Sequence, residues 1–208
     1  MSILDDWEIT ANQLTEMLHE NPSLRGMLLG YVAEFKLREI ITACPEVTYT
    51  TKFYDHNRKK KGDLYIVYKG QAFNIESKSL QTNTVTFDEV THTWSAKTQV
   101  DASDRREVTL PSGKKLNTTL LLRGEFDILA VNCYAFEKKW RFVFARNQDL
   151  PCSNYKKYTP KVRKALIASL ISVTWPPKPP FYSDIKQLLD EMVETGSWRA
   201  LATFLQKQ

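Results

Sequence analysis

Residues 62–78 read GDLYIVYKGQAFNIESK and contain the strongest strand and turn pattern of the chain. Residues 64–68 and 72–76 are rich in β-branched and aromatic side chains, which favour strands. Residues 69–71 read KGQ and are typical of a tight turn, because glycine adopts the positive φ angles that hairpin turns require. The stretch therefore predicts a β-hairpin with charged residues gathered at its open end.

Those charged residues form a candidate catalytic site. Asp63 opens the first strand and Glu76 and Lys78 close the second, and side chains alternate along a strand, so Glu76 and Lys78 share one face. Carboxylates are the ligands that a hard cation such as Mg²⁺ prefers, and an ammonium can orient a water molecule or stabilise charge on a phosphate. We expect Asp63, Glu76 and the main-chain carbonyl of Ser77 to bind metal, with Lys78 assisting hydrolysis of a phosphodiester.

These residues resemble the PD-(D/E)xK nuclease superfamily, which includes many type II restriction endonucleases. Gly62-Asp63 stands in place of the family's Pro-Asp, and Glu76-Ser77-Lys78 matches its ExK element. The missing proline leaves the metal ligand in place.

The resemblance covers about residues 24–80 and implies a further site residue. In many such enzymes the preceding helix contributes an acid near the metals, and Glu34 is the matching candidate. Residues 122–131 also look like the core strand that follows in restriction enzymes. The resemblance implies a Mg²⁺-dependent endodeoxyribonuclease, with Mn²⁺ as a substitute, that acts on double-stranded DNA as a sequence-specific type II restriction enzyme. A homodimer would match a two-fold DNA site.

Outward from this core, the pattern predicts helices before the hairpin and a mixture of strands and helices after it. Apolar spacing predicts one helix from Trp7 to Leu18 and a second from about Leu24 to Cys44, the latter with a stripe of large apolar residues. The predicted strands are 47–54, 64–68, 72–76, 118–122, 126–134 and 140–145. The later helices are about 161–171 and from 184 to 195, and 82–103 is a polar loop with room for a short helix. The fold class is therefore α/β, a restriction-endonuclease-like central mixed β-sheet flanked by helices, in a single domain over residues 1–208.

Composition and charge indicate the kind of protein and the kind of partner. The chain has 208 residues, of which 42% are hydrophobic, so it can bury a core without metals or disulfides. Its formal net charge of +5 favours nucleic acid as partner. The three cysteines and three histidines lack the spacing of a zinc site. With no signal peptide and no apolar run of membrane-spanning length, we expect a cytoplasmic protein that does not enter a membrane.

Basic and polar residues outside the catalytic stretch could hold DNA. One basic run directly precedes Asp63, a second cluster is interleaved with tyrosines, and a polar segment between them offers side chains that can read bases in a groove. The candidate DNA-binding residues are Arg58, Lys59, Lys60, Lys61, Gln99, Arg105, Arg106, Lys156 and Lys157. Solvated charged surfaces explain the same pattern.

Several alternatives stay open. Asp127 with residues 137–139 (EKK) forms a rival acid and lysine set, although that tripeptide is typical of an exposed hairpin tip. Asp63, Glu76 and Lys78 could instead form a solvated cross-strand ion pair, and Glu34 could pair with Arg38 one helical turn later. Function also has alternatives: a structure-selective repair or junction-resolving nuclease, or a non-catalytic DNA-binding protein of the same fold.

Overall fold

A computed structural model describes residues 1–52 and 62–196, and its centre is a five-stranded mixed sheet. In spatial order the strands are β1 (Val47–Lys52), β2 (Leu64–Tyr68), β3 (Gln71–Ser79), β8 (Ile128–Asn132) and β9 (Phe142–Arg146). β3 and β8 run parallel, and every other neighbouring pair is antiparallel. The prediction of an α/β fold with a central mixed sheet flanked by helices is confirmed.

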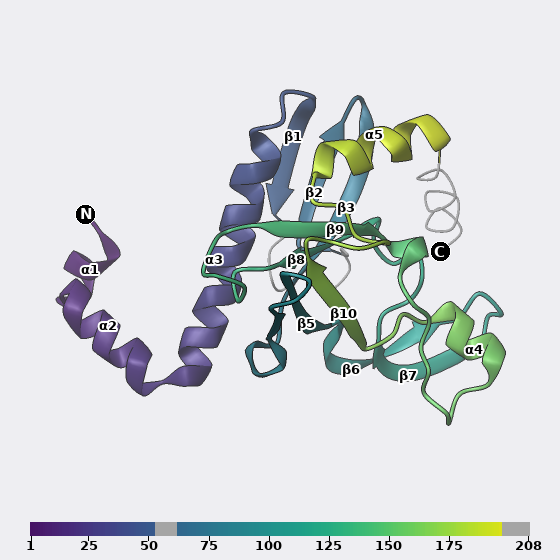
Figure 1. Ribbon diagram of the computed structural model, residues 1–208, viewed down its shortest axis with the longest axis horizontal. Coiled ribbons are helices and arrows are strands. Elements are labelled where there is room, and N and C mark those ends of the chain that lie inside the picture. The colour runs from purple at the N-terminus through teal and green to yellow at the C-terminus, as the bar shows by residue number, and fades with distance from the viewer. Residues whose placement is uncertain (53–61, 197–208) are drawn as a thin grey trace.

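The remaining elements surround this sheet (Figure 1). The helices are α1 (Ile3–Asp6), α2 (Ala11–Glu20), α3 (Pro22–Thr42), α4 (Pro160–Ala165) and α5 (Ile185–Thr195), with short 3₁₀ turns at Thr82–Thr84 and Asn147–Asp149. β10 (Leu170–Trp175), β5 (Thr93–Gln99) and β4 (Thr86–Asp88) form a three-stranded antiparallel sheet, and β6 (Asp101–Thr109) pairs with β7 (Lys115–Leu120).

The two faces of the central sheet are covered differently. On one face, which we call the helical face, Leu64, Phe73 and Ile128 pack against α3 and α5. On the opposite face, Leu129 and Val143 pack against the three-stranded sheet. β8 is buried along its whole length, as expected of a strand covered on both faces.

The predicted hairpin is confirmed. Lys69 and Gly70 have φ angles of 45° and 75°, which are the two positive values that a type I′ turn requires. The turn fixes the register so that Leu64 lies opposite Ile75. The ladder ends with that pair, so Asp63 lies at the open end of the hairpin, where its main-chain N–H donates to the carbonyl of Ile75.

Two predictions for the later chain are wrong. Residues 82–103 are no loop, since they contain β4, β5 and the start of β6. Their strand pattern is hidden because the buried positions of β5 hold a small Ala96 and a polar Thr98 rather than large apolar residues. The helix predicted over 161–171 ends at Ala165, and Leu170–Trp175 is a strand, because its β-branched residues pair with β5.

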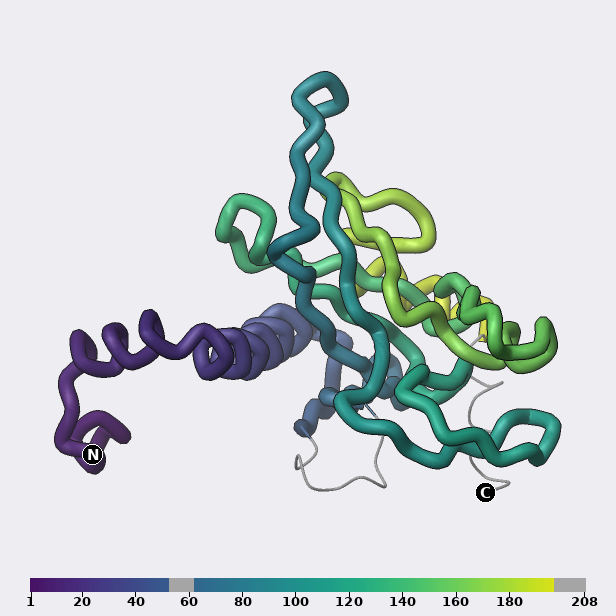
Figure 2. Tube along the Cα trace, turned by 90° about the horizontal axis from the view of Figure 1, so that it is seen from below, coloured from purple at the N-terminus to yellow at the C-terminus, as the bar shows by residue number. Residues whose placement is uncertain are grey.

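The N-terminal helices form an arm that projects from the body, as Figures 1 and 2 both show. The helix predicted from Trp7 to Leu18 begins only at Ala11, because Thr10 caps it, and a separate short helix capped by Ser2 precedes it. α3 begins at Pro22 and leads from the arm back to the sheet. No helix in the described ranges is long and apolar enough to span a membrane.

Candidate active site

Asp63 reaches the open end of the hairpin through an unusual backbone conformation at Gly62. Gly62 has a φ of +84°, which L side chains rarely adopt, and a Cβ there would lie 3.1 Å from the carbonyl oxygen of Ile75. This close approach lets the main-chain N–H of Asp63 donate to that same carbonyl at 2.8 Å. The Asp63 carboxylate is then held by the main-chain N–H of Ser77, which donates to its Oδ2 at 2.8 Å.

The structure brings Asp63, Glu76 and Lys78 together. Glu76 and Lys78 are two residues apart on β3 and share the face opposite the helices. Asp63 lies just before β2 and lines the pocket beneath α3, with its charge close enough to affect the pKa of Glu76. Lys78 Nζ forms an ion pair with Glu76 Oε1 at 2.8 Å. Their side chains are only 23% and 15% exposed, which is unlike a solvated surface pair.

Burial dominates the electrostatics of these groups. Desolvation raises the pKa of Asp63, opposed by the hydrogen bond from Ser77 and the charge of Lys78. Desolvation also raises the pKa of Glu76, again opposed by Lys78, and the neighbouring Asp63 charge raises it further. The pKa of Lys78 is raised, because attraction to Glu76 and Asp63 outweighs its own desolvation. Two crowded acids therefore share one cation, and the arrangement favours additional positive charge.

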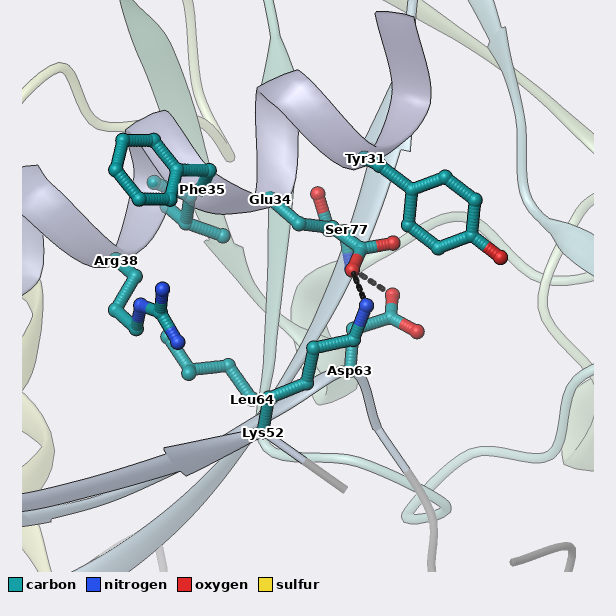
Figure 3. Close-up of a pocket in the computed structure, with 9 residues that line it drawn as sticks. Tyr31, Glu34, Phe35, Arg38, Lys52, Asp63, Leu64 and Ser77 are labelled. Carbon is teal, nitrogen blue, oxygen red and sulfur yellow. Dashed lines mark hydrogen bonds and ion pairs between the residues drawn. The ribbon is translucent and has the colours of Figure 1, made fainter. Parts of the chain in front are cut away.

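Glu34 lies on the other side of Asp63, in a pocket of about 210 Å³ between α3 and the sheet (Figure 3). Its Oε2 forms an ion pair with Lys52 Nζ at 2.6 Å rather than with Arg38. The Glu34 charge contributes to the raised pKa of Asp63, which shows that the two carboxylates interact. The structure thus places the predicted helix acid beside the strand acid, with Lys52 between them.

The donor set fits a hard cation. The N–H and C=O of one strand residue point to the same side, so Ser77, whose N–H reaches Asp63, directs its carbonyl toward the same edge. Mg²⁺ is commonly bound by one or two carboxylates together with water and substrate phosphate. Within residues 1–52 and 62–196, no group of three or more acidic, histidine or cysteine side chains forms a metal cluster. A cation at this edge would therefore rest on Asp63, Glu76 and the Ser77 carbonyl.

Three charged residues near the site, Lys52, Glu125 and Asp101, were not predicted from the sequence. Lys52 ends β1 opposite Leu64, one strand from Asp63, and a lone charge at the end of an uncharged strand was the available signal. Glu125 raises the pKa of Glu76 and pairs with Arg106 at 2.6 Å, while Asp101 raises the pKa of Lys78. These last contacts join segments far apart in sequence, so local spacing carried no signal for them.

The predicted DNA-binding residues are placed apart from one another. Gln99 is exposed on β5 and accepts a hydrogen bond from Gln81 at 3.2 Å. Arg105 is exposed on β6, whereas Arg106 is held by Glu125 beside the catalytic set. Lys156 and Lys157 are exposed just before α4, and Arg58, Lys59, Lys60 and Lys61 lie outside the described residues.

The rival acid, Asp127, has a structural role. Residues 137–139 and Asp127 lie beyond opposite ends of β8, so they do not meet. Asp127 is 7% exposed, and its Oδ2 accepts a hydrogen bond from the main-chain N–H of Asn74 at 2.7 Å. This contact ties β3 to the start of β8.

Asp127 makes stability depend on pH. Burial raises the pKa of Asp127 to about 6, so between about pH 4 and pH 6 the folded chain keeps a proton that the unfolded chain releases. Stability is therefore lost as pH rises through this window, by up to about 3 kcal/mol. Asp127→Asn keeps an acceptor for the Asn74 N–H but cannot ionise, so it should remove the loss of stability between about pH 4 and pH 6. Urea unfolding at several pH values measures it, with the exposed Glu194→Gln as control; equal pH slopes in D127N and the parent chain would contradict the prediction.

Comparisons with known proteins give one distant structural likeness. No family model matches the chain, and no curated protein does. A solved structure described as a bacterial homing endonuclease, I-Ssp6803I, is similar over 67% of this chain and 87% of its own, with 15% sequence identity and a TM-score of 0.34.

Proposed function

We propose that this chain is a Mg²⁺-dependent endodeoxyribonuclease that hydrolyses phosphodiester bonds of double-stranded DNA, in the manner of a sequence-specific type II restriction enzyme. The observation that carries the proposal is the convergence of Asp63, Glu76 and Lys78 at one sheet edge, partly buried and with both acid pKa values raised. A purely structural ion pair gains little from a second buried acid beside it. In a site that binds a cation, the second carboxylate raises the affinity for that cation.

Each residue has a definite task in such a site. Asp63 and Glu76 hold the cation together with the Ser77 carbonyl, and a bound Mg²⁺ supplies charge neutralisation and a more acidic water. Lys78, fixed by its ion pair with Glu76, donates hydrogen bonds to the attacking water or to the phosphate oxygens. Glu34 adds a carboxylate from the helical side, where Lys52 holds it in place.

The surrounding cations suit a polyanionic substrate. The net charge of +5 attracts DNA, and Arg105, Lys156 and Lys157 are exposed to receive its phosphates. Gln99 is exposed on β5 and is a candidate for reading bases. A homodimer would present two such sites to the two strands of a duplex.

Incubation of the purified chain with plasmid DNA and millimolar Mg²⁺ tests the proposal. Discrete fragments that disappear with EDTA are expected from a sequence-specific enzyme. Cleavage confined to branched or mismatched substrates would favour the repair or junction-resolving alternative. DNA binding without cleavage of any of these substrates, in Mg²⁺ or Mn²⁺, would overturn the nuclease assignment in favour of a non-catalytic DNA-binding protein.

A further inference from the structure

Helix α3 carries two apolar stripes on opposite sides. Ala33, Leu37 and Ile41 recur every four residues and are buried against the sheet. Leu24, Met27, Leu28, Tyr31 and Phe35 form the second stripe, on the opposite side, and are between 40% and 63% exposed. A helix that is apolar on two sides is expected to be covered on both.

The N-terminal half of α3 extends beyond the sheet and leaves the body (Figure 2). There, the side that would continue the sheet-facing stripe holds Gly26 and Gly30, and a Cβ added at either would meet nothing within 4 Å. The most exposed large apolar residues of this half, Leu24, Met27, Leu28 and Tyr31, lie on the outer stripe. Leu24, Met27 and Leu28 therefore belong to the projecting arm, whereas Tyr31 and Phe35, at the end of the stripe nearest the sheet, line the pocket beside Glu34.

The exposed area suits an interface between proteins. Further along the arm, Trp7 and Ile3 are each 59% exposed and Met17 is 38% exposed. The five side chains of the outer stripe, roughly 200 Å² each and about half exposed, present on the order of 500 Å², and the three residues on α1 and α2 raise the apolar area of the whole arm to about 800 Å². A standard interface takes about 800 Å² from each partner.

The distribution of charge along the chain indicates which partner the arm would bind. Residues 1–24, which make up most of the arm, contain five acidic residues and no lysine or arginine, so they have a formal charge of −5. Because the whole chain has +5, the chain from Arg25 onward has +10. An acidic arm is repelled by DNA and by anionic lipid, whereas a second copy offers both an identical apolar stripe and a strongly basic body.

We infer that the arm, formed by α1, α2 and the N-terminal half of α3, is a self-association surface, on which the outer stripe of α3 packs against that of a second copy. An isologous contact of this kind is self-complementary and closes as a two-fold dimer. The inference goes beyond the nuclease function and does not depend on it.

Sedimentation or light scattering of the full chain tests this inference. The parent chain should have a mass of twice 24.1 kDa. Met27→Glu and Leu28→Glu place a charge at the centre of the contact and should weaken association roughly thirtyfold or more. Because both residues are exposed in the single chain, the circular dichroism spectrum and the thermal midpoint of the diluted variants should be unchanged.

Gly26→Ala and Gly30→Ala are the matched controls, because they alter the same turns of α3 on its other side and should leave association intact. Glu16→Lys together with Glu20→Lys should weaken association at low salt and much less at high salt. A parent chain that stays at 24.1 kDa at high concentration, or M27E and L28E variants that still form dimers, would overturn the inference. Binding of a monomeric parent chain to lipid vesicles would overturn it as well, in favour of a membrane surface. Asp63→Asn should form dimers normally, so loss of cleavage and loss of association are separable.

Discussion

Asp63→Asn and Glu76→Gln are each expected to lower the rate of Mg²⁺-dependent DNA cleavage on the order of a thousandfold or more, since each removes a carboxylate worth several kcal/mol of metal-assisted stabilisation. Both substitutions keep the size of the side chain, and in D63N the amide oxygen can still accept from the Ser77 N–H. Single-turnover cleavage of a labelled duplex measures the effect.

Asp63→Asn, which leaves the ion pair of Lys78 with Glu76 intact, should also stabilise the protein in the absence of metal. Desolvation raises the pKa of both acids, so the folded state resists their ionisation, and stability falls as pH rises above the ordinary value near 4. Removing one charge should therefore raise the free energy of unfolding at neutral pH by roughly 1 kcal/mol. Glu194→Gln, on the exposed side of α5, should change neither cleavage nor stability. Full cleavage activity in D63N or E76Q would contradict the assignment.

Lys78→Met should have the opposite effect on stability while also removing cleavage. Lys78 is the cation that both acids share, and taking one member out of a buried pair typically costs about 3 kcal/mol or more. Guanidinium unfolding at neutral pH measures the loss. In this variant the buried Glu76 charge has lost its ion pair with Lys78. The loss of stability should therefore shrink as the pH is lowered, because protonation removes the Glu76 charge.

The double variant K78M/E76Q measures how much of this loss comes from the Lys78–Glu76 ion pair itself. If the cost of Lys78→Met comes from stranding the Glu76 charge, the double variant should regain most of the lost stability, and the cycle should give a coupling energy well above 1 kcal/mol. Lys97→Met, at an exposed position of β5, is the control for loss of a lysine. Additive effects of the two substitutions would show that the ion pair is incidental.

The hairpin and its charged end were predictable because their determinants are local. The positive φ angles at Lys69 and Gly70 set the turn, the turn sets the register, and the register brings Asp63 to the open end of the hairpin near Glu76. Because side chains alternate along a strand, Lys78 then lies on the same face as Glu76. Each step needs only neighbours in sequence, so a reading of residues 62–78 could follow it.

The rest of the site depends on packing between distant segments. Lys52 meets Glu34 only because β1 lies beside β2 and α3 crosses the sheet there, and Glu125 reaches Glu76 through the parallel pairing of β3 with β8. β5 escaped prediction because its buried side includes Thr98, which is polar and fully buried. No pattern within one segment records such contacts.

The positive φ of Gly62 bears on how sites of this kind are found in other chains. Proline has its φ fixed near −65°, so it could not replace Gly62 while the path into β2 stays as it is. Gly-Asp and Pro-Asp are thus two exclusive routes by which a chain can deliver an acid to the same sheet edge. Searches that require the dipeptide would pass over chains like this one, whereas a search for an acid directly before the first strand of a hairpin whose second strand ends in ExK would retain them.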